Sequence, residues 1–306
     1  MLDTVFAAMI MTAAVSCELL DNDPDKHVKD EDSTYVGLEE VAEIISLIPL
    51  QTSQLDEVHT AVTSSSGNGY DEEYTMKHLF ESPGAGVGDE QTRSAEAYDR
   101  PLRELIEDQV RKMHMTRSGE DGLDPDLFLD ELMKSDIQIY WPFSENWDGE
   151  SLPVITFDPE DGSEKNFGYR MVMEDDGSRR VEEVVVDEAM AEVEPVWVIN
   201  RNSDAGYATL EMLRREHPDW GEGGGTIIVR PSGQDQRETR VESSVKALIL
   251  KDFTMNRSYD SWFAGASEFF VKTGAVEDFT ASTEAELRLY SPTITDFLIV
   301  VKRSQI

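Results

Sequence analysis

The chain is poor in basic residues and contains a single cysteine. Its 306 residues include 27 Lys and Arg against 63 Asp and Glu, which gives a formal net charge of −36. A charge of this sign repels phosphate backbones, so nucleic acid is excluded as an expected partner. One cysteine cannot form an internal disulfide, so the disulfide framework of small secreted domains is absent. The apolar residues, 39% of the chain, must therefore hold the fold by themselves.

Signatures of common enzymes are also missing. The five histidines include no HExxH motif and no pair at zinc-ligand spacing. The stretch Gly84–Gly88 has no preceding strand and no following Lys-Ser or Lys-Thr pair, as a phosphate loop would require. Gly265–Glu268 lacks the second glycine of a nucleophile elbow. A non-enzymatic binding or scaffold module is therefore expected, and a secreted hydrolase acting on a glycan or peptide is the alternative.

The N-terminus has no apolar run long enough to span a bilayer. The stretch Val5–Val15 has eleven residues, the length of the apolar part of a signal peptide. It leads into Ala14-Val15-Ser16-Cys17, and small residues before a cysteine resemble the lipobox of bacterial lipoproteins. That resemblance implies that residues 1–16 are a signal peptide and that Cys17 is acylated as the first mature residue.

Residues 17–36 are acidic and contain a proline, which is typical of a flexible tether. Acyl chains on Cys17 contribute roughly 0.8 kcal/mol of membrane affinity for each buried methylene. We therefore expect an exported protein at the outer membrane or cell surface, with the membrane as a partner through the lipid anchor. Because Met1–Thr4 carry no Lys or Arg, the alternative is a cytosolic protein with an apolar N-terminal helix and a buried thiol.

The first folded region, residues 37–135, has the periodicity of helices. Apolar residues recur at helical spacing, and Pro49, the stretch Ser64–Gly69 and a glycine-rich loop from Ser82 to Thr92 interrupt them. Ser53, Asp99 and Asp124 are the expected caps. The pattern predicts helices over residues 38–48, 54–62, 99–113 and 124–134.

Short strands separated by turn residues follow, which together with the helices predicts an α+β fold. Residues 136–240 read as a mostly antiparallel β region in which Asp161-Gly162 and Asp176-Gly177 mark hairpin turns. Within residues 136–240, only Tyr207–Arg215 has the pattern of a helix. Residues 241–306 read as a β-sandwich-like region, incomplete at its C-terminal end. The expected strands are 137–143, 152–157, 167–173, 181–186, 196–200, 226–230, 245–253, 268–274, 285–290 and 295–302.

Two groups of residues are candidate sites. Asp252, Asn256, Asp260 and Glu268 flank a loop between strands, where carboxylates can gather around calcium, and no other cofactor is expected. Packing aromatics nearby favour a structural loop instead. Tyr140, Trp141, Phe143 and Trp147 cluster around Pro142 and form a candidate platform for a glycan or protein ligand. The alternative is that these rings cover the edge of the core.

Four motifs run through most of the chain: Ser64–Met76, Trp141–Gly149, Pro195–Arg201 and Tyr259–Lys272. With the lipobox-type leader and the acidic tether they resemble a family of uncharacterised Bacteroidetes surface lipoproteins. The resemblance implies export, a lipid anchor and a β-rich C-terminal part. It implies no particular ligand.

Overall fold

The computed structural model of the protein describes residues 36–81, 98, 100–116, 124–174, 176–204, 206–216, 254–274 and 294–305. Its described part combines helices with a mixed, mostly antiparallel sheet, so the α+β class is confirmed. The expected signal peptide, Cys17 and almost all of the tether lie outside the described residues, as do the strands expected over 226–230, 245–253 and 285–290. No described helix has the length and apolar character that a membrane crossing requires.

The helices begin where local side chains satisfy free backbone groups. The Asp124 carboxylate accepts a hydrogen bond from the Asp126 amide (2.9 Å), and Pro125 occupies the first position of the helix that follows. Gln51 and Gln54 form a capping box at the start of another helix. The described helices are α1 (Leu38–Ser46), α2 (Thr52–Gly67), α3 (Met76–Phe80), α4 (Leu102–Thr116), α5 (Pro125–Lys134), α6 (Glu188–Ala191) and α7 (Leu210–Glu216).

The main sheet, sheet A, has the strand order β1-β2-β6-β3-β4-β5 in the described residues. The β3 and β6 strands run parallel, and the other neighbours are antiparallel. Gly177, with φ of +80°, lies in the turn that closes the β4–β5 hairpin, as the Asp-Gly pair predicts. The strands are β1 (Glu73–Thr75), β2 (Ile137–Tyr140), β3 (Val154–Phe157), β4 (Lys165–Met173), β5 (Arg179–Asp187) and β6 (Val196–Arg201).

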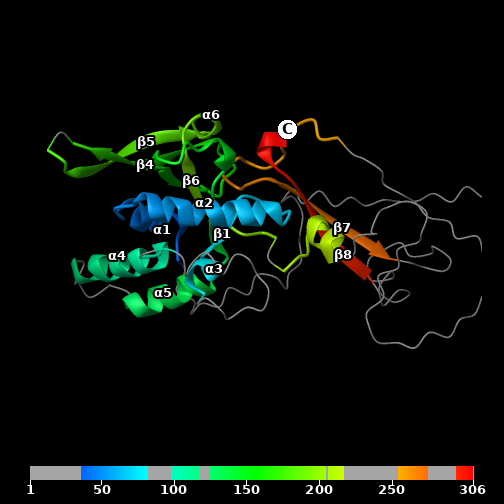
Figure 1. The fold of residues 1–306 in the computed structure, drawn as a ribbon, viewed down its shortest axis with the longest axis horizontal. Helices are drawn as coiled ribbons and strands as arrows, with labels where there is room; N and C mark the ends of the chain where they lie inside the picture. The colour runs from blue at the N-terminus through cyan, green and yellow to red at the C-terminus, as the bar shows by residue number, and fades with distance from the viewer. Residues whose placement is uncertain are drawn as a thin grey trace, which may run out of the picture.

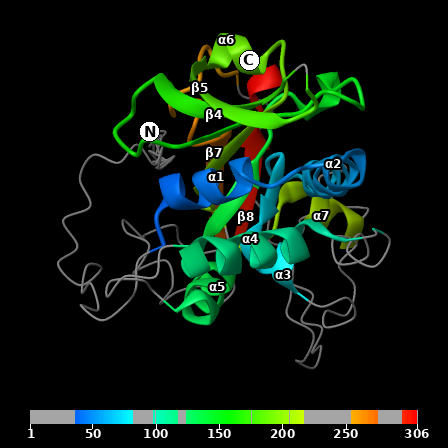
Figure 2. The same cartoon turned by 90° about the vertical axis from the view of Figure 1, so that its left-hand side faces the viewer.

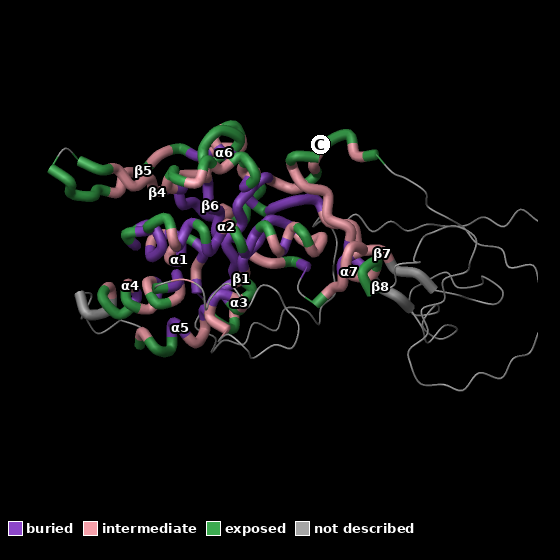
Figure 3. The backbone as a smooth tube through the Cα atoms, in the orientation of Figure 1, coloured by how far each residue is buried: buried purple, intermediate pink, exposed green. Residues whose placement is uncertain are grey.

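Both faces of the centre of sheet A are covered. Trp197 and Ile199 belong to the larger apolar core, which contains the buried faces of the helices. Val196 and Val198 alternate with them and face a second core that includes Trp262 and Phe263. Figures 1 and 2 show α1 and α2 between the β4–β5 hairpin and the pair α4 and α5. In Figure 3 the buried segments gather around β6, β1 and α2.

The C-terminal segment, defined here as residues 254–274 and 294–305, contains a two-stranded antiparallel sheet, β7 (Ser267–Gly274) and β8 (Ile294–Val301). A short 3₁₀ turn, η3 (Arg303–Gln305), follows β8 and lies near α6 in Figures 1 and 2. The segment is tied to the rest of the molecule by the Leu298 amide, which donates to the Ala208 carbonyl (2.9 Å). The described residues thus place β7 and β8 beside sheet A as a second sheet.

Three sequence predictions in the helical region were wrong in detail. The helix expected to stop at Val62 continues to Gly67, because Ser65 is fully buried and packing outweighs the weak helix preference of Ser64–Ser66. The expected cap Ser53 lies inside this helix, which Gln51 caps instead. Residues 73–75, expected within a helical region, form β1 because they pair with β2.

Candidate functional site

A tight aromatic turn follows β2. Pro142 ends the strand, and Phe143 adopts a left-handed conformation with φ of +57°, which costs a non-glycine residue about 1–3 kcal/mol. A 3₁₀ turn, η2 (Ser144–Asn146), comes next. The Ser144 hydroxyl donates to the Glu72 carboxylate (3.1 Å), and the Trp147 indole donates to the Ser151 carbonyl (3.0 Å). These bonds hold the strained turn in place.

The turn forms one wall of a pocket, which we call the aromatic pocket. The opposite wall comes from the end of α6 and the residues before β6. The pocket has a volume of about 110 Å³, which is room for several water molecules. Its lining residues are Trp141, Phe143, Asn146, Trp147, Asp148, Ser151, Ala191, Glu192, Val193, Glu194 and Pro195.

The aromatic rings of the pocket are supported from behind. The rings of Trp141 and Trp147 lie 5.3 Å apart in an edge-on arrangement. His59 of α2 contacts both, at 5.5 Å from Trp141 and 5.1 Å from Trp147, and its ring Nε2 lies 3.2 Å from the Ser144 carbonyl. Ring pairs in this geometry contribute about 0.5–1.5 kcal/mol beyond burial. The rings are therefore held rigidly before any ligand arrives.

The charges of the aromatic pocket are negative. Hydrogen bonds from the Ser151 side chain and backbone and from the Glu150 backbone lower the pKa of Asp148 to about 2, so this carboxylate is ionised at neutral pH. Glu194 forms an ion pair with Arg170 (2.7 Å), and Val193 is 79% exposed at the rim. Because no Lys, Arg or His side chain is among the lining residues, the pocket offers acceptors and ring faces but little to an anion.

The four predicted ligand-binding residues separate into two groups. Trp141, Phe143 and Trp147 line the aromatic pocket. Tyr140 does not line it, because its side chain is fully buried on the other core of sheet A. Trp141 is itself 1% exposed, so it forms the floor of the pocket and also part of the core.

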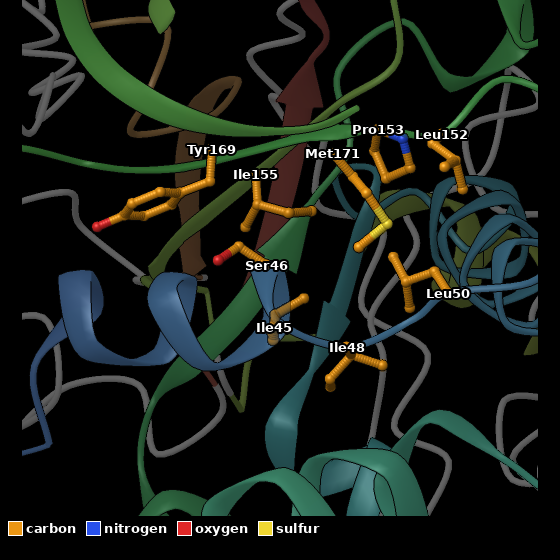
Figure 4. A pocket seen from close by; sticks show the side chains of 9 residues that line it. All are labelled: Ile45, Ser46, Ile48, Leu50, Leu152, Pro153, Ile155, Tyr169 and Met171. Carbon is orange, nitrogen blue, oxygen red and sulfur yellow. The ribbon is translucent and has the colours of Figure 1, made fainter. Parts of the chain in front are cut away.

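A second pocket lies between α1 and β4. Ile45 and Ser46 of α1 and the following Ile48 and Leu50 point toward Tyr169 and Met171 (Figure 4). Its volume is about 10 Å³, which is at the lower limit for a single water molecule. It is a packing crevice of the apolar core, and we assign it no ligand.

Three of the four predicted metal ligands, Asn256, Asp260 and Glu268, lie within the described residues. Asp252 lies outside the described residues. The Glu268 carboxylate accepts a hydrogen bond from Ser203 (2.9 Å), while burial raises the pKa of Asp260. Within the described ranges, no three Asp, Glu, His or Cys side chains are placed so that they could hold a metal ion.

A set of buried carboxyl groups lies at the junction between sheet A and the C-terminal segment. We call it the carboxyl cluster, and it consists of Asp71, Glu72, Glu73, Asp204 and Glu268. The first four are between 2% and 8% exposed. The sequence singles out Glu268, as a candidate metal ligand, but not the other four, because a chain with 63 acidic residues contains many acidic runs. The local signal available for three of them was the acidic triplet Asp71–Glu73 between Tyr70 and Tyr74.

Burial raises the pKa values of the whole carboxyl cluster. Burial and the neighbouring Asp71 raise the pKa of Glu72 to about 8, and burial raises the pKa of Glu268 to about 8 and that of Asp204 to about 6. Burial also raises the pKa of Glu73 well above its usual range, and Asp204 and Asp71 add to this effect. These groups hold protons at a pH where exposed carboxyls have lost them.

Comparison with known proteins identifies no relative: no family model matches the chain, and neither a curated protein nor a solved structure is similar to it.

Proposed function

We propose that this chain is the binding module of an exported surface lipoprotein, and that the aromatic pocket holds its ligand. The observation that carries the proposal is the pocket itself, where Trp141, Phe143 and Trp147 meet polar side chains around about 110 Å³ of open space. Concave sites with rigid rings and a few polar groups are the usual form of small-ligand sites in proteins.

The chemistry of the lining favours a neutral glycan. Asn146, Asp148, Ser151 and Glu192 supply mostly acceptor oxygens, and sugar hydroxyls are donors that can satisfy them. The exposed part of Trp147 and the ring of Phe143 present apolar faces on which a sugar ring can pack. The negative charge of the lining disfavours acidic sugars and phosphates.

The location of the protein is part of the same proposal. Acylation of Cys17 after removal of residues 1–16 would tether the folded part to the outer membrane through residues 17–36. The C-terminal part, 241–306, would form a β-sandwich-like region that includes β7 and β8. Mass spectrometry of the protein extracted from cells tests the anchor, because a diacylglyceryl group on Cys17 supports it and an intact Met1 contradicts it.

Binding is tested by titrating the chain with neutral oligosaccharides built of hexose and of N-acetylhexosamine in a calorimeter. A Trp147→Ala variant is expected to lose at least about tenfold in affinity, equivalent to about 1.4 kcal/mol. Tyr259→Ala is the matched control, since Tyr259 is an aromatic residue 51% exposed outside the pocket. Equal losses in both variants, or no binding of any of these sugars by the folded protein, contradict the proposal.

A secreted glycan or peptide hydrolase is the second candidate. The observation in its favour is the Glu72 carboxyl, whose pKa of about 8, raised by burial, is suited to a general acid, and which contacts the pocket turn through Ser144. Glu72 is not among the lining residues of the aromatic pocket. Release of reducing sugar or peptide by the wild-type chain, lost in Glu72→Gln, would favour the hydrolase over the binding module.

A further inference from the structure

The C-terminal segment is held on the rest of the molecule by polar contacts and by a shared apolar core. The Ala266 amide donates to Asp71 Oδ2 (2.8 Å), and the Asn200 side chain donates to the carbonyls of Phe263 (2.9 Å) and Ala264 (3.1 Å). The Trp262 indole donates to the Glu164 carbonyl (3.0 Å). The apolar part of the contact comes from Trp262 and Phe263, which are 1% and 0% exposed.

Carboxyl groups outnumber basic groups at this contact. The carboxyl cluster contributes Asp71, Glu72 and Glu73 from β1 and the residues before it, Asp204 from the loop after β6, and Glu268 from β7. The other carboxyl groups that face it are Glu145 of η2, Glu188 of α6 and Asp260 before β7, and the buried phenol of Tyr140 lies beside Asp71 and Glu72.

The basic groups that act on the cluster are Lys302 and Arg303, and both already have other partners. Arg303 donates to the carbonyls of Asp260 (2.6 Å) and Gly265 (3.2 Å) and pairs with Glu188 (3.4 Å). The Lys302 ammonium donates to the Ser66 hydroxyl. If the carboxyl cluster were fully ionised, these two cations would face five negative charges, four of them buried, which is a costly arrangement.

The buried polar atoms near the cluster lack donors. In the described structure Asn200 Oδ1, Asn202 Oδ1 and Asp204 Oδ2 are buried without a hydrogen-bond partner. Asn200 is 0% exposed and Asp204 is 2% exposed, so water has little access to them. A protonated carboxyl group is an O–H donor, whereas an ionised one only accepts. A protonated carboxyl group of the cluster is the kind of donor that these acceptors lack.

We infer that the C-terminal segment docks on sheet A through neutral carboxyl groups of the carboxyl cluster, and that loss of their protons at alkaline pH releases the segment while sheet A stays folded. The inference follows from the geometry of a buried contact with many acceptors and few donors. The raised pKa values of Glu73, Glu268 and Glu72, caused chiefly by burial, agree with it.

The test uses the full chain labelled with 5-fluorotryptophan and followed by ¹⁹F NMR from pH 5 to pH 9. Trp262 reports on the docked segment, and Trp197, which is 0% exposed in the centre of sheet A, reports on the rest. A Trp262→Phe variant assigns the first signal. The inference predicts that the Trp262 signal moves to the position of a solvent-exposed indole with a midpoint between about 6 and about 8, while the Trp197 signal does not move.

Variants Glu73→Gln and Glu268→Gln, alone and combined, imitate the neutral side chains. They are expected to move the midpoint of the Trp262 transition to higher pH, most strongly in the combined variant, whereas Glu39→Gln on the exposed side of α1 leaves the midpoint at its wild-type position. A wild-type Trp262 signal that stays unchanged from pH 5 to pH 9, or that moves together with Trp197, overturns the inference. If the combined variant does not fold, the wild-type titration decides the question alone.

Discussion

Asp71 and Ala266, separated by 195 positions in the chain, are joined by a hydrogen bond of 2.8 Å from the Ala266 amide to the Asp71 carboxylate. The second Asp71 oxygen accepts from the Glu72 amide (2.8 Å). The buried Asp71 side chain thus binds the backbone of Glu72 and the backbone of the loop before β7 at the same time. The contact requires close approach of the backbone at Gly265, where an added Cβ atom would lie 2.9 Å from Asp71 Oδ2.

Gly265→Ala is therefore expected to weaken docking of the C-terminal segment. Gly265 has φ of +118°, so alanine is strained there, and the Cβ atom also clashes with the Asp71 carboxylate. We expect a loss of about 2–4 kcal/mol in the free energy of unfolding, measured in urea. Gly206→Ala is the matched control, because Gly206 has φ of +90° but open space around it. Equal costs at the two positions would show that Asp71 is not close to Gly265.

Arg303 is expected to be irreplaceable by lysine. Its side chain is 8% exposed and donates to two carbonyls and to Glu188, a geometry that the guanidinium fork fits and a single ammonium does not. Both Arg303→Lys and Arg303→Ala should increase acrylamide quenching of Trp262, measured against a Trp262→Phe background. Recovery of wild-type quenching in Arg303→Lys would show that only the charge matters.

Glu57 holds the N-terminus of α4. The carboxylate is 0% exposed and accepts hydrogen bonds from the Leu102 amide (2.7 Å) and the Tyr74 hydroxyl (3.4 Å), while burial raises its pKa. Glu57→Ala leaves a buried amide without an acceptor, which costs about 1–3 kcal/mol. Urea unfolding monitored by circular dichroism measures the loss, with the exposed neighbour Asp56→Ala as control. A cost below about 0.5 kcal/mol would contradict this role.

Sequence patterns predicted the longer helices and every described strand except β1, but not how the strands pair, because pairing joins segments that are distant in the chain. The Asp124 cap and the apolar stripe of α4 were readable from the residues, and the structure confirms a helix at each. Three-residue β1 has no local signal, since pairing with β2 creates it. The parallel pairing of β3 with β6 also depends on chain segments about 40 positions apart, roughly the span of a crossover connection.

One wall of the aromatic pocket could be predicted from the sequence, and the other could not. The rings of Trp141, Phe143 and Trp147 stand together in the sequence, but the opposite wall, Ala191–Pro195, joins them only through the sheet. Of the carboxyl cluster, only Glu268 was a candidate from the sequence, as a metal ligand, because an acidic chain gives no indication of which carboxyls the fold buries. Tyr140 was predicted to lie in the same ligand platform as Trp141. Because successive side chains of a strand point to opposite faces, its ring lies on the opposite side of sheet A from Trp141.

Stability is expected to fall as the pH rises from 5 to 9. Burial raises the folded-state pKa of Glu72 and Glu268 to about 8 and of Asp204 to about 6, whereas unfolded carboxyls titrate near pH 4. Between these values the folded state holds more protons than the unfolded state, so the free energy of unfolding decreases with rising pH. The lowered pKa of Asp148 acts in the opposite direction only below about pH 4.

Urea unfolding at pH 5, 7 and 9 measures this dependence. Glu268→Gln should flatten the slope between pH 5 and pH 8, because it removes one titrating group while it keeps the shape of the side chain. A free energy of unfolding that rises over this range in the wild type would contradict the assigned protonation of the carboxyl cluster.

The most direct test of the account is the indole N–H spectrum of ¹⁵N-labelled protein during titration with neutral hexose and N-acetylhexosamine oligosaccharides. Trp147 lines the aromatic pocket and donates its indole N–H to Ser151, whereas Trp197 and Trp262 are buried elsewhere. The account predicts that the Trp147 signal shifts in a saturable manner while those of Trp197 and Trp262 remain still. A Trp147 signal that does not move for any of these sugars would contradict the assignment of the aromatic pocket as the ligand site.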